Sequence, residues 1–247
     1  METTRKLSNL KSSKSNSSNK TGKNAIPAGG VTLRFKAVLS DLDGTLVDSQ
    51  HCVDYSWQVW AEDRGLDLEE VMRICHGRRT IETVKDITPH LDSATEVAFL
   101  EELEATCTKG MVPVLGAHDL VGKLGAHQFA VITSGSNRLA THRLSHVGFK
   151  IPKVFVTSDD VLNGKPHPEG YLSAAKQLGV EPTQCLVLED SPAGIRAGND
   201  AGMTTIGIAA HSADHDISHA SYVVQDLTWL TVEQDGEEFV VTIKRGI

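Results

Sequence analysis

Two aspartates, Asp41 and Asp43, stand two residues apart in the segment 41–45 (Asp-Leu-Asp-Gly-Thr), directly after a short apolar run. Carboxylates clustered at the end of a strand repel one another unless a cation joins them, and an oxygen-rich site of this kind suits Mg²⁺. Gly44 allows the chain to turn where a side chain would clash. The segment alone is equally consistent with an Asp-rich turn, because Asp and Gly are common turn residues.

Hydroxyl and lysine side chains follow two later apolar runs. Segment 133–136 (Thr-Ser-Gly-Ser) opens a predicted helix, where its hydroxyls and free backbone N–H groups can hold an anion. Lys165 is flanked by Gly164 and Pro166, and the restricted backbone favours a fixed cation. The simpler interpretations are an ordinary helix cap for the first segment and a solvated surface lysine for the second.

A second acidic pair, Glu189 and Asp190, follows a fourth apolar run and precedes Ser191 and Pro192, which are typical of a helix start. An acid near a helix start can also be a plain capping residue. Four such polar groups at the carboxyl ends of four strands would converge in space if the strands were parallel. Convergence favours one shared site over four unrelated surface features.

Apolar runs and helix-like stretches alternate along the chain. Apolar runs occur at 35–39, 129–132, 154–156, 185–188 and 205–208, with helix-like stretches at 137–147, 168–178 and 192–201. Continuous apolar strands alternating with helices predict a parallel sheet that is covered on both faces. At the end of the chain, 230–233 and 239–243 flank Asp235-Gly236 and predict a peripheral hairpin.

One interval between the first strand and residue 112 has no convincing strand. Helical patterns occur there at 53–62, 68–75, 80–86 and 94–106. Four helices exceed what a single crossover needs, so we expect a smaller domain over residues 49–111 that can close over the site like a lid. The alternative is a set of crossover helices packed on the main core.

The composition of the chain indicates which broad class of protein it belongs to. The chain has 247 residues, of which 40% are hydrophobic, and a formal net charge of −8. No apolar run reaches the roughly 18 residues of a membrane helix. Acidic charge disfavours wholesale binding to nucleic acid or to anionic lipid. We therefore expect no nucleic-acid partner and no membrane partner.

Residues 1–30 differ from the rest, with six Lys or Arg against one Glu and few large apolar side chains. This composition predicts a disordered basic tail. It lacks the apolar core of a secretory signal, and a transit peptide is the alternative. The cysteines are scattered, which argues against a disulfide scaffold or a thiolate zinc site and favours a reducing compartment, here the cytoplasm. They are Cys52, Cys75, Cys107 and Cys185.

The four motifs in this order, Asp-x-Asp-Gly-Thr, Thr-Ser, Gly-Lys-Pro and Glu-Asp-Ser, resemble those of the haloacid dehalogenase-like hydrolases over roughly residues 35–225. The helical insertion is similar to the cap of the phosphoglucomutase-like subgroup. Segment 76–80 and the predicted hairpin resemble microbial phosphatases of 2-deoxyglucose 6-phosphate and of glycerol phosphate. The resemblance implies an α/β fold with a Rossmann-like parallel core (31–48 and 112–247), a helical cap (49–111) and a C-terminal β-hairpin.

The resemblance also implies roles. Asp41 would be the nucleophile that forms an aspartyl-phosphate, and Asp43 would be the general acid and base. The predicted Mg²⁺ ligands are Asp41, the Asp43 backbone carbonyl, Glu189 and Asp190. The groups predicted to bind the phosphate or the rest of the substrate are Thr45, Ser134, Gly135, Lys165, Arg78 and Arg79. The alternative for the two cap arginines is a solvated basic turn.

These roles predict Mg²⁺-dependent hydrolysis of a small sugar or polyol phosphate, and the resemblance implies a monomer. Asp43 favours phosphoryl transfer, because dehalogenase members lack an acid at that position. Mutase members carry a histidine about a dozen residues beyond the nucleophile, where this chain has Val53, with His51 close by. The alternatives are a sugar phosphomutase and a non-catalytic phosphate-binding module.

Overall fold

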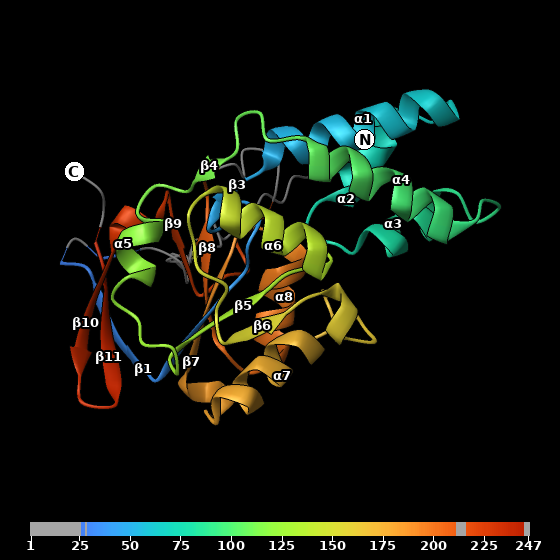
Figure 1. Ribbon diagram of the computed structural model, residues 1–247. Helices are drawn as coiled ribbons and strands as arrows, with labels where there is room; N and C mark the ends of the chain where they lie inside the picture. Colours follow the sequence, from blue (N-terminus) through green and yellow to red (C-terminus); the bar gives the residue numbers. More distant parts are fainter. Residues whose placement is uncertain (1–25, 28, 211–215, 245–247) are drawn as a thin grey trace, which may run out of the picture.

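The computed structural model describes residues 26–27, 29–210 and 216–244, and its centre is a six-stranded parallel sheet in the order β6-β5-β2-β7-β8-β9 (Figure 1). The strands are β2 (Ala37–Ser40), β5 (Phe129–Ile132), β6 (Val154–Val156), β7 (Cys185–Glu189), β8 (Thr204–Ile208) and β9 (Tyr222–Val224). The predicted parallel α/β sheet is confirmed. β9 was not predicted from the sequence.

The strands are continuously apolar because both faces of the sheet are covered. In β2, Val38 packs into one hydrophobic cluster, whereas Ala37 and Leu39 pack into another on the opposite face. Helices α7 (Glu169–Leu178) and α8 (Pro192–Asp200) contribute to the cluster of Ala37 and Leu39. Helices α5 (Ala117–Val121) and α6 (Asn137–His146) contribute to the cluster of Val38. Successive side chains of a strand point to opposite faces of the sheet. When neither face is solvated, apolar and polar residues therefore do not alternate along the strand.

A second, antiparallel sheet packs onto the cluster of Val38. It consists of β1 (Val31–Phe35), β11 (Glu238–Ile243) and β10 (Leu230–Asp235), with β11 in the middle. The predicted C-terminal hairpin is confirmed as β10 and β11. The predicted single strand at 35–39 is wrong: the chain breaks at Lys36, because β1 pairs with β11 while β2 pairs with β5 and β7.

Four helices follow one another within residues 49–111 and lie at the upper right of Figure 1 over one end of the sheet; we call this group of helices the cap. They are α1 (Gln50–Arg64), α2 (Leu68–Cys75), α3 (Thr80–Ile87) and α4 (Ser93–Thr106). A small core of their own holds them together, with Trp60 and Leu100 fully buried in it. The chain leaves the core domain through β3 (Val47–Asp48) and returns through β4 (Val112–Pro113), which pair antiparallel.

A disulfide joins Cys52 and Cys107, which are 55 residues apart in the sequence. The scattered spacing of the cysteines argued against a disulfide scaffold, but this one pair is bonded. The reason is tertiary: α1 and α4 pack against each other, which brings the start of one beside the end of the other. The other two cysteines, Cys75 and Cys185, are free and buried.

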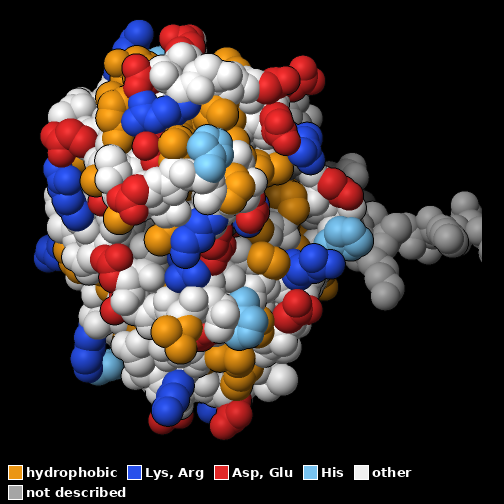
Figure 2. Space-filling view, turned by 90° about the vertical axis from the view of Figure 1, so that its right-hand side faces the viewer, with side chains coloured by type: hydrophobic (Ala, Val, Ile, Leu, Met, Phe, Trp, Pro, Cys, Tyr) orange, Lys and Arg blue, Asp and Glu red, His pale blue; other side chains and the backbone are white. Residues whose placement is uncertain are grey.

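The predicted basic tail lies mostly outside the described residues. Ile26, which the prediction placed in that tail, is buried in the hydrophobic core, so at least this position was assigned wrongly. In the described part of the chain, none of the helices combines the length and the apolar character of a membrane span. On the face that Figure 2 shows, Lys and Arg side chains are interspersed with Asp and Glu.

Candidate active site

The polar segments singled out from the sequence meet at one edge of the parallel sheet. Asp41 directly follows β2, Ser134 follows β5 by two residues, and Asp190 directly follows β7. A cavity lies between this edge and the cap. Its core-side lining includes Asp41, Asp43, Ser134, Gly135, Arg143 and Asp190, and its cap-side lining includes Trp57, His76, Gly77, Arg78 and Glu104.

Lys165 reaches this edge from the loop after β6. Its ammonium contacts Asp41 Oδ1, lies 2.6 Å from Glu189 Oε1, and donates to the carbonyl of Ile132 at 3.1 Å. Burial alone would lower the pKa of Lys165, but the carboxylates of Asp41 and Glu189 outweigh burial and raise that pKa above its usual value. The lysine is therefore a fixed positive charge beside Asp41.

Three carboxylates offer oxygens to one point. Oxygens of Asp41, Glu189 and Asp190 lie within 4.8 Å of one another, and all three side chains are largely shielded from solvent. Burial raises the pKa of Asp41 to about 8, with Lys165 lowering it and Glu189 raising it. Burial and the neighbouring carboxylates raise the pKa of Asp190 well above its usual value. When all three acids are ionised, one lysine leaves their negative charge in excess, and this all-oxygen donor set suits Mg²⁺.

The backbone is shaped around this acidic cluster. A side chain at Gly44, where φ is +79°, would place its Cβ 1.9 Å from Asp190 Oδ2. A side chain at Gly194 would place its Cβ 1.6 Å from Glu189 Oε1. Only glycine fits at either position, so the carboxylates of Asp190 and Glu189 lie where larger residues would exclude them.

Glu189 is fully buried and does not line the cavity. Its Oε1 accepts from the Tyr171 hydroxyl at 3.0 Å, in addition to Lys165. Its Oε2 accepts from the Ser191 amide and hydroxyl at 3.0 and 2.9 Å. Tyr171 was not found from the sequence, because a tyrosine on the buried face of α7 has the same pattern as any core residue.

Asp43 lines the cavity with both carboxylate oxygens engaged. Ser49 Oγ donates to Oδ1 at 2.6 Å, and Arg143 Nη1 donates to Oδ2 at 2.7 Å. The sequence-based prediction missed Arg143. One feature could have revealed it, since Arg143 shares the buried face of α6 with Leu139 and Leu144, where a solvated arginine does not belong.

The predicted phosphate-binding groups lie beside the cap. Ser134 Oγ donates to the carbonyl of Gly77 at 3.0 Å, and the Gly135 amide donates to Thr133 Oγ1 at 3.0 Å. Both Ser134 and Gly135 line the cavity. Thr45 is fully buried and is not in the cavity lining, and its Oγ1 has no hydrogen-bond partner among the described residues.

The two cap arginines differ in position. Arg78 lines the cavity and lies 2.8 Å from Asp86 through Nη2. Arg79 does not line it. Instead, Arg79 donates to the carbonyls of Val161 and Leu162 at 3.1 and 3.0 Å, which fastens the cap to the loop after β6.

The chain is similar to known proteins in sequence and in fold. Residues 35–202 match the family model of the haloacid dehalogenase-like hydrolases. The chain is 38% identical to hexitol phosphatase A of Escherichia coli (strain K12), over 81% of this chain and 95% of that protein. It is 35% identical to 2-deoxyglucose-6-phosphate phosphatase 2 of Saccharomyces cerevisiae (strain ATCC 204508 / S288c), over 82% and 92%.

A solved structure with a similar fold is β-phosphoglucomutase from Clostridium difficile. The TM-score is 0.63 at 20% identity, over 80% of this chain and 93% of that one. At this identity the likeness concerns the fold alone.

Proposed function

The chain belongs to the haloacid dehalogenase-like hydrolases and is a phosphoric monoester hydrolase, and on that premise we propose that it hydrolyses small sugar or polyol phosphates through an aspartyl-phosphate on Asp41. Three of its curated relatives are named for hexitol, 2-deoxyglucose 6-phosphate and glycerol 1-phosphate. Each name denotes a small polyhydroxylated phosphate ester or its parent polyol. The common chemistry is an alkyl leaving group that carries hydroxyls.

We assign Mg²⁺ to the acidic cluster, held by Asp41, Asp190 and the backbone carbonyl of Asp43, with Glu189 supporting the site. Bound there, the ion supplies positive charge that lets an anionic nucleophile approach an anionic phosphoryl group. Glu189 acts mainly on its neighbours, because its oxygens are already engaged by Lys165, Tyr171 and Ser191.

In the first step, a carboxylate oxygen of Asp41 attacks phosphorus and the bond from phosphorus to the sugar oxygen breaks. Asp43 gives its proton to that oxygen, because an alkoxide is a poor leaving group. Lys165, Ser134 and the Gly135 amide stabilise the phosphoryl oxygens as charge moves onto them. The Lys165 ammonium is suited to this role because it already lies against the Asp41 carboxylate.

In the second step, the Asp43 carboxylate removes a proton from water as the water oxygen attacks phosphorus. The bond between phosphorus and Asp41 breaks, which releases phosphate and restores both aspartates to their starting states. The cap supports this step by enclosing the cavity, since its Gly77 lies against Ser134 and Ser191 of the core. We propose residues 49–111 as the cap domain and 31–48 with 112–247 as the core domain.

The mutase alternative is disfavoured by the cavity wall. Val53 lines the cavity at the position where mutases carry a histidine, whereas His51 is exposed and does not line it. We therefore propose transfer of the phosphoryl group to water rather than to a second sugar hydroxyl. A mutase would release little phosphate and would depend on a bisphosphate activator.

The observation that carries the proposal is the contact between Lys165 and Asp41, at the point where Asp190 and Glu189 also converge. The test is phosphate release from a panel of sugar and polyol phosphates, with Mg²⁺ and with EDTA. We expect release only with Mg²⁺, and at least about a 10³-fold loss in Asp41→Asn, which keeps the shape but not the nucleophile. Asp119→Asn, an exposed aspartate on α5, is the control and should retain full activity. Full activity in Asp41→Asn would contradict the assignment.

A further inference from the structure

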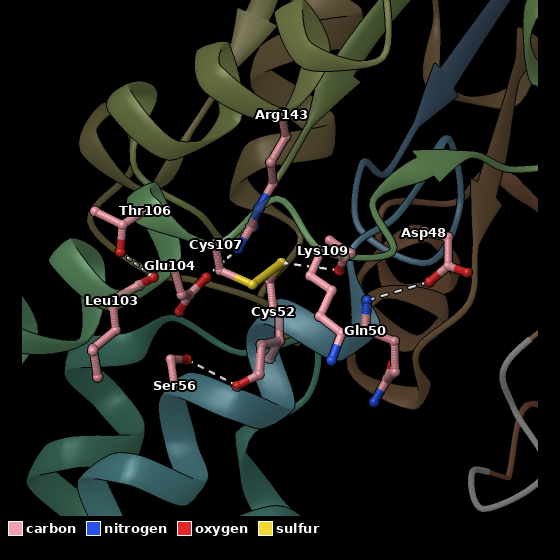
Figure 3. The surroundings of a disulfide bond; sticks show 12 residues. Asp48, Gln50, Cys52, Ser56, Leu103, Glu104, Thr106, Cys107, Lys109 and Arg143 are labelled. Carbon is pink, nitrogen blue, oxygen red and sulfur yellow. Dashed lines mark hydrogen bonds and ion pairs between the residues drawn. A yellow bond between two sulfur atoms is a disulfide. The ribbon is translucent and has the colours of Figure 1, made fainter.

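Arg143 is a buried cation that connects the core domain to the cap. It projects from α6, and its side chain is only 4% exposed. One nitrogen, Nη1, donates to Asp43 Oδ2 at 2.7 Å, and the other, Nη2, contacts Oε2 of the buried Glu104. Glu104 belongs to α4 of the cap. Figure 3 shows Arg143 reaching from its helix toward Glu104, beside the Cys52–Cys107 disulfide.

Asp43 is held at both ends of its carboxylate. Arg143 occupies Oδ2 and Ser49 occupies Oδ1, so the carboxylate plane cannot rotate without losing a hydrogen bond. General acid–base catalysis depends on the angle and distance at which the proton is passed, and small displacements lower the rate strongly. The group that fixes Asp43 therefore sets how well Asp43 works.

We propose that Arg143 is a positioning residue for Asp43, and that Glu104 couples this positioning to the seated cap. The inference rests on the proposed role of Asp43 as acid and base. When Asp43 gives its proton to the leaving oxygen it becomes a carboxylate, and the hydrogen bond from Arg143 strengthens as that charge develops. When Asp43 takes a proton from water in the second step, the same hydrogen bond keeps the carboxylate facing the cavity.

Glu104 prevents a competing use of the same arginine. A guanidinium at the cavity wall would otherwise be drawn to the phosphoryl group of the substrate, to which it can bind in a bidentate manner. Glu104 holds Nη2 and balances the charge of Arg143. Because Glu104 moves with the cap, Arg143 is fully anchored only when the cap is seated on the core.

The arrangement is poorly explained as a device for stability. A buried ion pair loses much of its attraction to desolvation, and apolar residues of similar volume often stabilise as well or better. In addition, Nε of Arg143 is buried without a hydrogen-bond partner among the described residues. The same two helices are already bridged at the surface, where Arg138 Nη2 lies 2.8 Å from Glu102 Oε2.

The test compares Arg143→Lys and Glu104→Gln with two matched controls, Arg138→Lys and Glu102→Gln, which alter the exposed bridge between the same helices. Two substrates are used. The first is 2-deoxyglucose 6-phosphate, whose leaving alkoxide needs a proton. The second is p-nitrophenyl phosphate, whose leaving group departs without one, so formation of the aspartyl-phosphate no longer depends on Asp43 as an acid.

With the sugar phosphate, we expect Arg143→Lys to lower kcat by about 10²-fold and to change KM by less than about threefold. With p-nitrophenyl phosphate, single-turnover release of nitrophenol should stay within about threefold of the unaltered protein, while steady-state turnover falls because water activation is impaired. Glu104→Gln should show the same pattern with a smaller loss. Both control variants should behave like the unaltered protein.

Equal losses on the two substrates, including the single turnover, would overturn the proposal, and so would unchanged kcat in Arg143→Lys. If that variant does not fold, the isosteric Glu104→Gln decides by the same criteria. If instead the proposed function itself is wrong, the experiment gives a different result. In that case the unaltered protein itself releases no phosphate from either substrate.

Discussion

The disulfide between Cys52 and Cys107 joins the first turn of α1 to the residue that follows α4, so it closes the cap at its base. The two covalent connections to the core, through β3 and β4, lie just outside this ring. The disulfide therefore links the two ends of the cap segment to each other, close to where the chain enters and leaves the cap. Its helices are held together on the side that faces the core.

Removal of this disulfide should lower the stability of the protein. Closure of a loop of 55 residues restricts the unfolded chain by about 4 kcal/mol at 25 °C, which corresponds to roughly 10 °C in Tm for a chain of this size. The double variant Cys52→Ser with Cys107→Ser should melt lower by about that amount, measured by circular dichroism. The unaltered protein should melt lower in reductant, and the double variant should not respond. A reductant-independent Tm in the unaltered protein would contradict the disulfide.

The two free cysteines should resist alkylation. Burial raises the pKa of the Cys75 thiol and of the Cys185 thiol to about 12. At pH 8, on the order of one thiol in ten thousand would be ionised, and the thiolate is the reactive form. We expect mass spectrometry to find neither residue modified by iodoacetamide in the folded protein, and both modified after unfolding. Labelling of Cys75 in the folded state would show that the cap core is open.

Seating of the cap should depend on Gly77. A Cβ there would lie 2.5 Å from the Ser191 side chain, whereas Gly65 has a similar positive φ but open space around it. Each of Gly77→Ala and Gly65→Ala introduces backbone strain of about 1 kcal/mol. Only Gly77→Ala should also separate the cap from the core, with a loss of about 10²-fold in kcat/KM. Equal activity in the two variants would mean that the contact between Gly77 and Ser191 is unimportant.

Binding of Mg²⁺ should be coupled to pH. Without metal, the pKa of Asp41 is raised to about 8, chiefly by burial, so the folded protein keeps a proton that the unfolded chain loses near pH 4. The unfolding free energy of the metal-free protein should therefore fall as pH rises from about 4 to 8. Because Mg²⁺ requires the carboxylate, its affinity should rise by up to about tenfold per pH unit toward pH 8. Calorimetric titration at several pH values measures this, and a pH-independent affinity would contradict the raised pKa.

Much of the core could be predicted because each part has a local cause. Apolar runs covered on both faces predicted the strands from β5 to β8, and Ser191 with Pro192 predicted the start of α8. Asp41, Ser134 and Asp190 could be assigned to one site, because the carboxyl ends of parallel strands share one edge of a sheet. Here a local pattern and a general rule of topology were sufficient.

Other features were missed because they depend on partners distant in the sequence. Residues 31–35 alternate apolar and polar side chains, unlike the continuously buried β2, but the strand predicted from the sequence began only at Phe35. That β1 joins the other sheet depends on its pairing with β11, near the far end of the chain. Arg143 interrupts the apolar stripe on the buried face of α6, which marks it as unusual, and Glu104 lies on the buried face of α4. The residue pattern of either helix does not predict that Arg143 pairs with Asp43 and Glu104. The sequence placed Arg79 at the substrate, whereas in the structure it holds the cap to a core loop.

Hydrophobic periodicity and turn chemistry act over a few residues, so they were enough to predict the strands β5 to β8, the helical insertion and a cluster of acids beside Lys165. By contrast, the bond between Cys52 and Cys107 and the place of Arg143 between Asp43 and Glu104 could not be predicted from the sequence. These pairings follow from how α1, α4 and α6 pack, and helix packing depends on the shapes of whole surfaces. Those shapes cannot be predicted from the residues next to a position in the sequence.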